Sequence, residues 1–197
     1  MKRLILMALV AVMSLTASAQ VYVGGSVGLW RDYNANETSF NLIPEVGYNL
    51  SDKWAIGLQI GYVHDYKGGV DLDLDFFQDR FGSQKTNGLV IKPYARWSYA
   101  EFGPVRLFLD MGFGFDTYKV KWKVGDRTVK SDPFNAWEIG VSPGLAVSLT
   151  ENLDFIAHVG FLGFRDSDDG SAAKFGRDGF GFNVDGNNLN FGLYYNF

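Results

Sequence analysis

The sequence predicts an all-β protein, an eight-stranded antiparallel up-and-down transmembrane β-barrel. Apolar residues recur at every second position in eight segments, which is the spacing of a strand with one apolar face. These segments hold about 10–14 residues, more than the about 5–6 of a typical soluble strand and enough to cross a bilayer at a tilt. The connections between them alternate between short turns and long loops, as in membrane barrels.

The N-terminal residues predict a secretory signal peptide at 1–19, with the barrel domain at 20–197. Lys2 and Arg3 precede an unbroken apolar run, and the run is followed by the small-residue cleavage pattern Ala17-Ser18-Ala19. A membrane anchor is the alternative, but the run is short for a helix that needs about 20 apolar residues to span. The protein is therefore expected to be exported.

Four segments make up the first half of the predicted barrel: 21–30, 39–50, 54–62 and 87–100. In the third segment, large apolar residues are separated by Ala, Gly or Gln: Trp54, Ile56, Leu58, Ile60 and Tyr62. A Ser-Asp-Lys turn at 51–53 joins the second and third segments, whereas longer loops are expected at 31–38 and 66–86.

The second half contains the segments 105–116, 134–148, 153–161 and 189–197. The alternation in the fifth segment is carried by Val105, Leu107, Leu109, Met111, Phe113 and Phe115. Short turns are expected at 101–104 and 150–152, and long loops at 118–133 and 166–186. Because the strand number is even, both termini are expected at the end that carries the short turns.

Three prolines, Pro44, Pro93 and Pro143, lie inside predicted strands. Proline has no backbone N–H and removes one hydrogen bond from a sheet. We therefore expect a bulge or a break in the ladder at each of them.

The composition of the two strand faces indicates which one faces inward. One face carries Leu, Ile, Val, Phe, Tyr and Trp, and the other carries Gly, Ser, Asn and charged residues. The interior of an eight-stranded barrel only just accommodates side chains, so the large apolar residues do not fit there. The apolar face is thus expected to contact lipid, and backbone groups in lipid require a closed sheet without edges.

Aromatic residues near the strand ends predict two girdles at the membrane interfaces. Trp54, Trp97 and Tyr195 lie near the short-turn ends, and Trp30 and Trp137 near the loop ends.

Six charged residues fall on the predicted inner face: Glu45, Lys92, Arg96, Arg106, Asp110 and Glu138. An isolated buried ion costs several kcal/mol, so these groups are expected to meet in one ion-pair cluster. Such a cluster predicts a plugged barrel interior, and a narrow water or ion path through the cluster is the alternative.

The whole mature chain resembles the OmpA-like family of small eight-stranded outer-membrane β-barrels. The resemblance rests on the signal peptide, the eight amphipathic strands and a terminal strand that ends in an aromatic residue. The final alternating residues are similar to the family's C-terminal assembly signal: Leu189, Phe191, Leu193, Tyr195 and Phe197. The resemblance implies an outer-membrane location, insertion by the barrel-assembly machinery, and contact with lipid and lipopolysaccharide. We expect no peptidoglycan-binding domain after the barrel.

A structural and surface-interaction role is the function that these patterns favour. A lipid A-modifying enzyme is a weaker alternative, because neither His64 nor His158 has a neighbouring catalytic pattern in the sequence. A soluble ligand-binding barrel is a further alternative. The chain has no Cys, which excludes a disulfide framework and a thiolate metal site. We expect no catalytic residues, metal, cofactor or nucleic-acid partner, and a monomeric barrel.

Lys119, Lys121, Lys123, Arg127 and Lys130 make the third long loop basic. Lysines there alternate with apolar residues, which predicts a hairpin that rises above the bilayer. Contact between this hairpin and lipopolysaccharide phosphates is a hypothesis from its charge.

Overall fold

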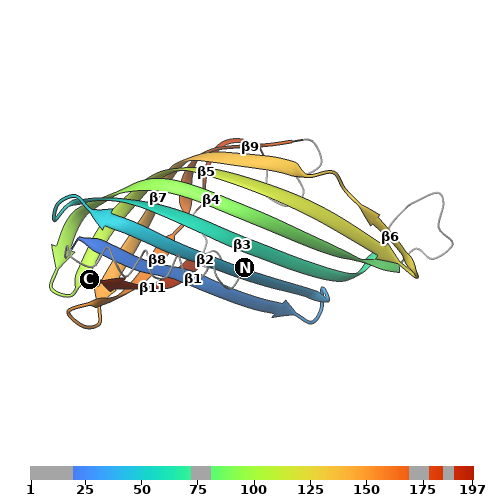
Figure 1. Ribbon diagram of the computed structural model, residues 1–197, viewed down its shortest axis with the longest axis horizontal. Coiled ribbons are helices and arrows are strands. Elements are labelled where there is room, and N and C mark those ends of the chain that lie inside the picture. Colours follow the sequence, from blue (N-terminus) through green and yellow to red (C-terminus); the bar gives the residue numbers. More distant parts are fainter. Residues whose placement is uncertain (1–19, 72–80, 169–177, 184–188) are drawn as a thin grey trace, which may run out of the picture.

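The computed structural model describes residues 20–71, 81–168, 178–183 and 189–197, and all regular structure in these ranges is antiparallel sheet (Figure 1). The predicted signal peptide at 1–19 lies outside the described residues. The strands are β1 (Val21–Asp32), β2 (Glu37–Asn49), β3 (Trp54–Asp71), β4 (Phe81–Phe102), β5 (Val105–Val124), β6 (Arg127–Lys130), β7 (Phe134–Ser148), β8 (Leu153–Val159), β9 (Phe161–Ser167), β10 (Gly179–Asn183) and β11 (Leu189–Asn196). No helix among the described residues is long and apolar enough to cross a membrane.

These elements form a closed eight-stranded barrel, which confirms the predicted fold. β8 and β9 are two parts of one barrel strand, separated at Gly160, where φ is 80°. Both parts pair with β7. β10 and β11 complete the last barrel strand by pairing with β9 and β8. The barrel closes between β1 and β11, from Tyr22 opposite Asn196 to Ser26 opposite Gly192.

Three strands are much longer than predicted, with 18 residues in β3, 22 in β4 and 20 in β5. The expectation of loops throughout 66–86 and 118–133 is therefore wrong, because cross-strand pairing continues where the alternation of side chains continues. β10 likewise lies within the predicted loop 166–186. The hairpin predicted in the basic segment is formed by β5 and β6. It lies at the right end of Figure 1, opposite the short turns.

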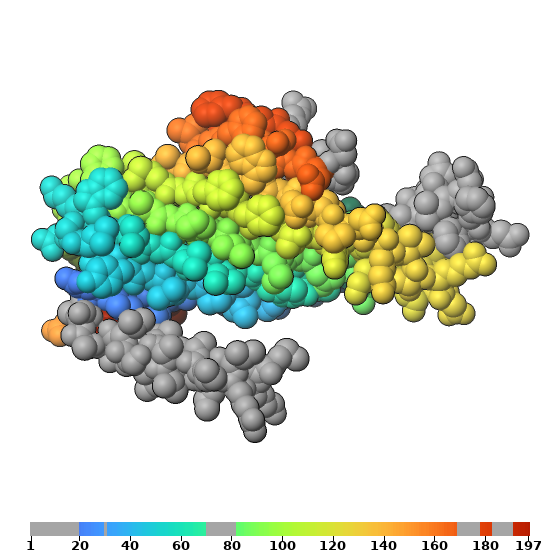
Figure 2. Space-filling model, turned by 45° about the horizontal axis from the view of Figure 1, so that its top comes forward, coloured from blue at the N-terminus to red at the C-terminus, as the bar shows by residue number. Residues whose placement is uncertain are grey.

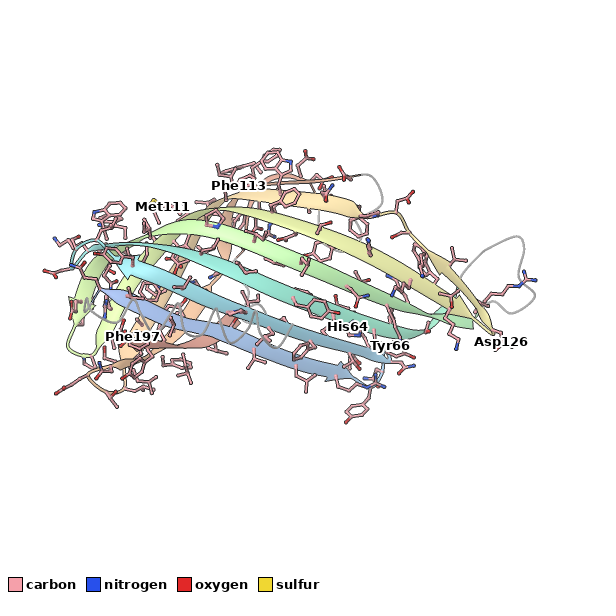
Figure 3. The ribbon with its side chains drawn as sticks, viewed as in Figure 1. His64, Tyr66, Met111, Phe113, Asp126 and Phe197 are labelled. Atoms are coloured by element: carbon pink, nitrogen blue, oxygen red, sulfur yellow. The ribbon has the colours of Figure 1, made fainter. Side chains whose placement is uncertain are left out.

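Phe197 and Asp126 mark the two ends of the barrel in Figure 3. Phe197 lies at the end that carries the turns after β2, β4 and β7, and its N–H donates to the carbonyl of Val21 at 3.1 Å. Asp126 lies in the turn between β5 and β6 at the other end. The first described strand therefore begins, and the chain ends, at the short-turn end, as the even strand number predicts.

Each of the three strand prolines coincides with an interruption of one ladder, as expected from the missing N–H. The β2–β3 pairing is interrupted between Leu42 and Glu45, around Pro44. The β4–β5 pairing is interrupted between Ile91 and Tyr94, around Pro93. Pro143 lies where β7 changes its partner from β9 to β8, opposite the break at Gly160.

Inward-facing glycines provide room for aromatic rings inside the narrow barrel. A Cβ at Gly47 would overlap the ring of Tyr22, and a Cβ at Gly57 would overlap the ring of Tyr94. The outward face is apolar and exposed, as Phe113 and Phe115 on β5 illustrate. The polar and glycine-rich face is thus the inner one, in agreement with the expectation from side-chain volume.

Candidate functional site

Arg96 of β4 lies at the centre of a buried polar cluster inside the barrel. Its Nε and Nη2 atoms donate to the two carboxylate oxygens of Asp110 on β5, each at 2.7 Å. Nη2 also lies 3.6 Å from a carboxylate oxygen of Glu45 on β2. A bidentate pair of this kind is among the strongest hydrogen-bonded ion pairs in proteins. We call Glu45, Tyr94, Arg96, Asp110, His158 and Tyr194 the Arg96 cluster.

The carboxylate of Glu45 is held by three neutral donors in addition to the charge of Arg96. The hydroxyl of Tyr194 donates to it at 2.5 Å, and Nε2 of Gln59 donates at 2.8 Å. The hydroxyl of Tyr94 donates to its other oxygen and lies 2.5 Å from the hydroxyl of Tyr22. These donors replace the water that the buried carboxylate has lost, which is the condition for keeping an ion in the interior.

His158 of β8 joins the cluster through Asp110. Its Nε2 lies 2.8 Å from Oδ2 of Asp110, and its ring contacts Phe108 edge-on at 5.4 Å between centroids. The partner of His158 is therefore a carboxylate that Arg96 already binds, and this contact fixes the orientation of the histidine ring.

Aromatic and aliphatic side chains seal the space around Arg96. The guanidinium carbon of Arg96 lies 4.1 Å from the ring centroid of Phe108, which is only 1% exposed. It lies 5.2 Å from the ring centroids of both Tyr94 and Tyr194. Ile156 and other buried residues fill the rest of the lumen at this level. We call this level of the barrel, with Arg96, the rings around it and Ile156, the Arg96 layer. The cation is thus surrounded by π-faces and excluded from water on several sides.

A second ion-pair group, the Glu138 cluster, lies nearer the long-strand end. Glu138 of β7 accepts hydrogen bonds from Nζ of Lys92 at 2.5 Å and from Nε of Arg165 at 2.8 Å. A cavity of about 300 Å³ separates it from the Arg96 cluster and is lined by residues of both, including Lys92, Asp110, Glu138 and His158. This volume is well above the about 10–15 Å³ that a single water requires, so the cavity accommodates water or small ions.

A third pair lies on the short-turn side of the Arg96 cluster. Arg106 of β5 lies 3.6 Å from Asp154 of β8, which also accepts a hydrogen bond from Nδ2 of Asn196 at 3.0 Å. A small polar pocket is lined by these residues and lies on the short-turn side of Arg96 and Phe108, which also line it. The Arg96 layer therefore separates two polar spaces within the barrel.

The six predicted interior charges all face the lumen, but the expectation that they form one cluster is wrong. Glu45, Arg96 and Asp110 meet in the Arg96 cluster, Lys92 meets Glu138, and Arg106 meets neither group. Their different heights along tilted strands separate them, because register rather than strand membership decides which side chains are level.

The sequence interpretation missed several residues of these groups: Tyr22, Tyr94, Asp154, Arg165 and Tyr194. Most of them share the inward parity of the predicted charges, so the period-2 pattern contains the signal. Tyr94 lies midway between the inward residues Lys92 and Arg96. The pattern does not extend to Arg165, because the break at Gly160 shifts the inward-facing positions from even-numbered residues in β8 to odd-numbered residues in β9.

Aromatic side chains gather on the outward face at both ends of the apolar band. Trp54 and Trp97 are direct neighbours across β3 and β4 and stack at 6.2 Å between ring centroids. At the other end, Trp137 stacks with Phe113 at 6.3 Å and contacts Phe164 at 5.3 Å. The side chain of Trp30 lies outside the described residues.

His64 belongs to this outward belt. Its Nδ1 lies 2.8 Å from Oδ1 of Asn87, which also accepts a hydrogen bond from the hydroxyl of Tyr62. No group of three metal-binding side chains is found in the part of the chain that the structure describes.

The residues of the predicted C-terminal signal lie on the final strand, where Phe191, Leu193 and Tyr195 are exposed on the outward face. The rings of Tyr195 and Phe197 meet edge-on at 5.0 Å between centroids, and Phe191 stacks on Phe155 at 5.6 Å. The side chain of Leu189 lies outside the described residues.

Comparison with known families and structures identifies one family match. The profile of the outer membrane protein beta-barrel domain matches residues 4–197. No curated protein sequence is significantly similar to the chain.

Three outer-membrane barrels are among the solved structures to which the chain is similar. The N-terminal β-barrel domain of Pseudomonas aeruginosa OprF is 15% identical, with a TM-score of 0.48 over 91% of this chain and 98% of that chain. Neisserial surface protein A is 15% identical, with a TM-score of 0.44 over 91% and 98%. A major outer membrane protein from Thermus thermophilus is 13% identical, with a TM-score of 0.45 over 90% and 98%.

Proposed function

We propose that this chain, which belongs to the outer membrane protein beta-barrel family and lies in the bacterial outer membrane, is a structural barrel with a plugged interior. The observation that supports this proposal is the Arg96 layer. A buried guanidinium, two carboxylates and the surrounding rings fill the lumen between the cavity and the pocket beneath it. Opening a path requires the ion pairs to separate, and leaving one buried partner uncompensated costs about 3–5 kcal/mol.

In this proposal the long-strand end faces the cell exterior and offers the β3–β6 region as an interaction surface. The short turns and both ends of the mature chain face the periplasm, as in membrane barrels of this architecture. Closure between β1 and β11 favours a monomer, and the outward residues of the last strand are the proposed contact for the barrel-assembly machinery. Lipid and lipopolysaccharide are the proposed partners of the outward face.

Single-channel recordings in planar bilayers test the plug. We expect no discrete current steps from the wild-type barrel, and steps from the double variant Arg96→Ala/Phe108→Ala, which opens the layer between the two polar spaces. The matched control is Phe191→Ala, which removes an aromatic ring from the outward face and leaves the lumen intact. A double variant that folds and remains silent contradicts the assignment of the plug to this layer.

A narrow conducting pore is the second candidate function, and the two polar spaces on either side of one layer favour it. In that case the layer would act as a gate instead of a permanent plug. Discrete currents from the wild-type barrel that persist in variants of the outward face would support the conducting pore and contradict the permanent plug.

A further inference from the structure

Five lysines gather on one face of the sheet that extends beyond the apolar band. Lys85 of β4, Lys121 of β5 and Lys130 of β6 are direct partners across three neighbouring strands. Lys119 and Lys123 lie two residues to either side of Lys121 on β5. All five side chains are exposed, and we call them the lysine face.

The lysine face continues the outward face of the barrel. On β5, Phe113 and Phe115 are exposed, and the residues of the same parity farther along the strand are Lys119, Lys121 and Lys123. Of the residues of the opposite parity on this part of β5, Val120 and Val124 are buried and Trp122 is half-buried. Figure 3 shows Phe113 on the outside of the barrel and Asp126 at the tip of the β5–β6 hairpin.

The lysine face begins just beyond the aromatic belt along β5. Phe115 is the direct partner of Trp137 in the belt at the long-strand end. Lys119 follows Phe115 by four residues, which is about 13 Å along a strand and less along the membrane normal because barrel strands tilt. The hairpin that carries the lysines protrudes from the body of the barrel in Figure 2, at the right.

Charge repulsion indicates that the lysine face requires anions. Like charges directly opposite each other in a sheet are destabilising. Among the described residues, none of the five lysines forms an ion pair, and Nζ of Lys85 lies 5.8 Å from the ring centroid of Tyr66. Of the neighbouring acids, Asp116 belongs to the inward parity of β5 and Asp126 lies in the turn at the tip, whereas Asp132 is exposed two residues after Lys130. The fold therefore concentrates five positive charges next to the lipid-facing surface, and no ion pair among the described residues neutralises them.

We propose that the lysine face binds the phosphate groups of lipopolysaccharide in the outer leaflet. This inference rests on the proposed orientation, with the β5–β6 hairpin outside the cell. The occupant is a lipid and not a soluble polyanion, because the lysines are continuous with the apolar face and not with the lumen. An acyl chain that packs beside Phe113 and Phe115 carries its headgroup phosphates to the level of Lys119 and beyond.

Lipid binding to the refolded barrel, measured by native mass spectrometry, tests this proposal. The probes are lipid A with both phosphates and the same lipid A with its phosphates removed. We expect the double variant Lys85→Gln/Lys121→Gln to bind the phosphorylated lipid at least about tenfold more weakly, since each surface lysine contributes to anionic lipid binding. The control Lys53→Gln/Lys67→Gln carries the same change in net charge, in the short turn before β3 and at the Glu37 ion pair, and is expected to bind within about twofold of wild type.

Two outcomes overturn the proposal. Equal binding of phosphorylated and phosphate-free lipid A by the wild-type barrel would show that the lysines do not recognise the phosphate groups. Equally tight binding of inositol hexakisphosphate, abolished by the same double variant, would assign the face to a soluble polyanion.

Failure of the underlying orientation is measured separately. The chain has no Cys, so Asp126→Cys introduces a single thiol at the hairpin tip. Labelling of intact cells with a membrane-impermeant maleimide is expected, and absence of labelling would refute the orientation and with it the access of the lysines to lipopolysaccharide. Conductance of the wild-type barrel would refute the plug alone and leave the lysine face unaffected.

Discussion

Arg96 and Asp110 are direct partners in the register of β4 and β5, and two hydrogen bonds of 2.7 Å join their side chains inside the barrel. The pair is located where β2, β8 and β11 also contribute Glu45, His158 and Tyr194. One cross-strand contact thereby connects side chains from distant parts of the chain. Because the pair lies away from water, its removal has larger effects than removal of an ion pair at the barrel rim.

Arg96→Gln is expected to lower the free energy of unfolding by about 3–5 kcal/mol, because it leaves the carboxylates of Glu45 and Asp110 buried without their cation. Urea titration of the refolded barrel, followed by tryptophan fluorescence, measures this change. The control Lys67→Gln breaks the ion pair with Glu37, in which both side chains are exposed (52% and 39%), so it is expected to cost less than about 1 kcal/mol.

Combining Arg96→Gln with Asp110→Asn is expected to recover part of that loss, because one of the two orphaned carboxylates is neutralised. A double-mutant cycle with urea titration gives the coupling energy between the two side chains. Strict additivity of the two substitutions would contradict direct coupling within the cluster.

Gly57→Ala is expected to destabilise the barrel by about 1–3 kcal/mol through overpacking. A Cβ at this position overlaps the ring of Tyr94, and that ring is held by Glu45 and Tyr22 and has little freedom to move. The control is Gly181→Ala, where no heavy atom among the described residues lies within 4 Å of the new Cβ. The temperature at which the barrel loses its folded migration on a gel reports the difference.

Tryptophan depth in the bilayer is expected to follow the two belts. In single-tryptophan variants, Trp54, Trp97 and Trp137 should be quenched most by lipids brominated near the headgroup and less by lipids brominated at the chain ends. Trp122 of the β5–β6 hairpin serves as the comparison and should be quenched by neither kind of brominated lipid. Strong quenching of Trp54 or Trp97 by lipids brominated at the chain ends would show that these residues do not lie at the short-turn interface.

Deletion of Phe197 is expected to lower the amount of folded barrel in cells without preventing refolding in detergent. In the folded barrel the residue contributes one backbone hydrogen bond at the rim and the contact with Tyr195. If the assembly machinery recognises the C-terminal aromatic residue, its loss lowers the efficiency of membrane insertion and leaves the final fold unchanged. Equal loss in cells and in detergent would indicate a purely structural role.

The strand pattern predicted much of this molecule because period-2 alternation is a local property of the chain. Eight barrel strands, their inward and outward faces, the ladder interruptions at three prolines and the short-turn end all follow from residues a few positions apart. The lengths of β3, β4 and β5 did not follow, because strands that extend past a membrane have the same alternation as strands within it, but with lysine in place of apolar residues.

The sequence by itself determined the fold class and placed six charged residues on the inner face of the barrel. Only the tertiary structure decided their partners. Arg96 meets Asp110 and Glu45 while Arg106 meets Asp154, because strand tilt and register set the height of each side chain and no local pattern encodes that height. The same register aligns Lys85, Lys121 and Lys130 across three strands, and that alignment turns separate basic residues into one charged surface.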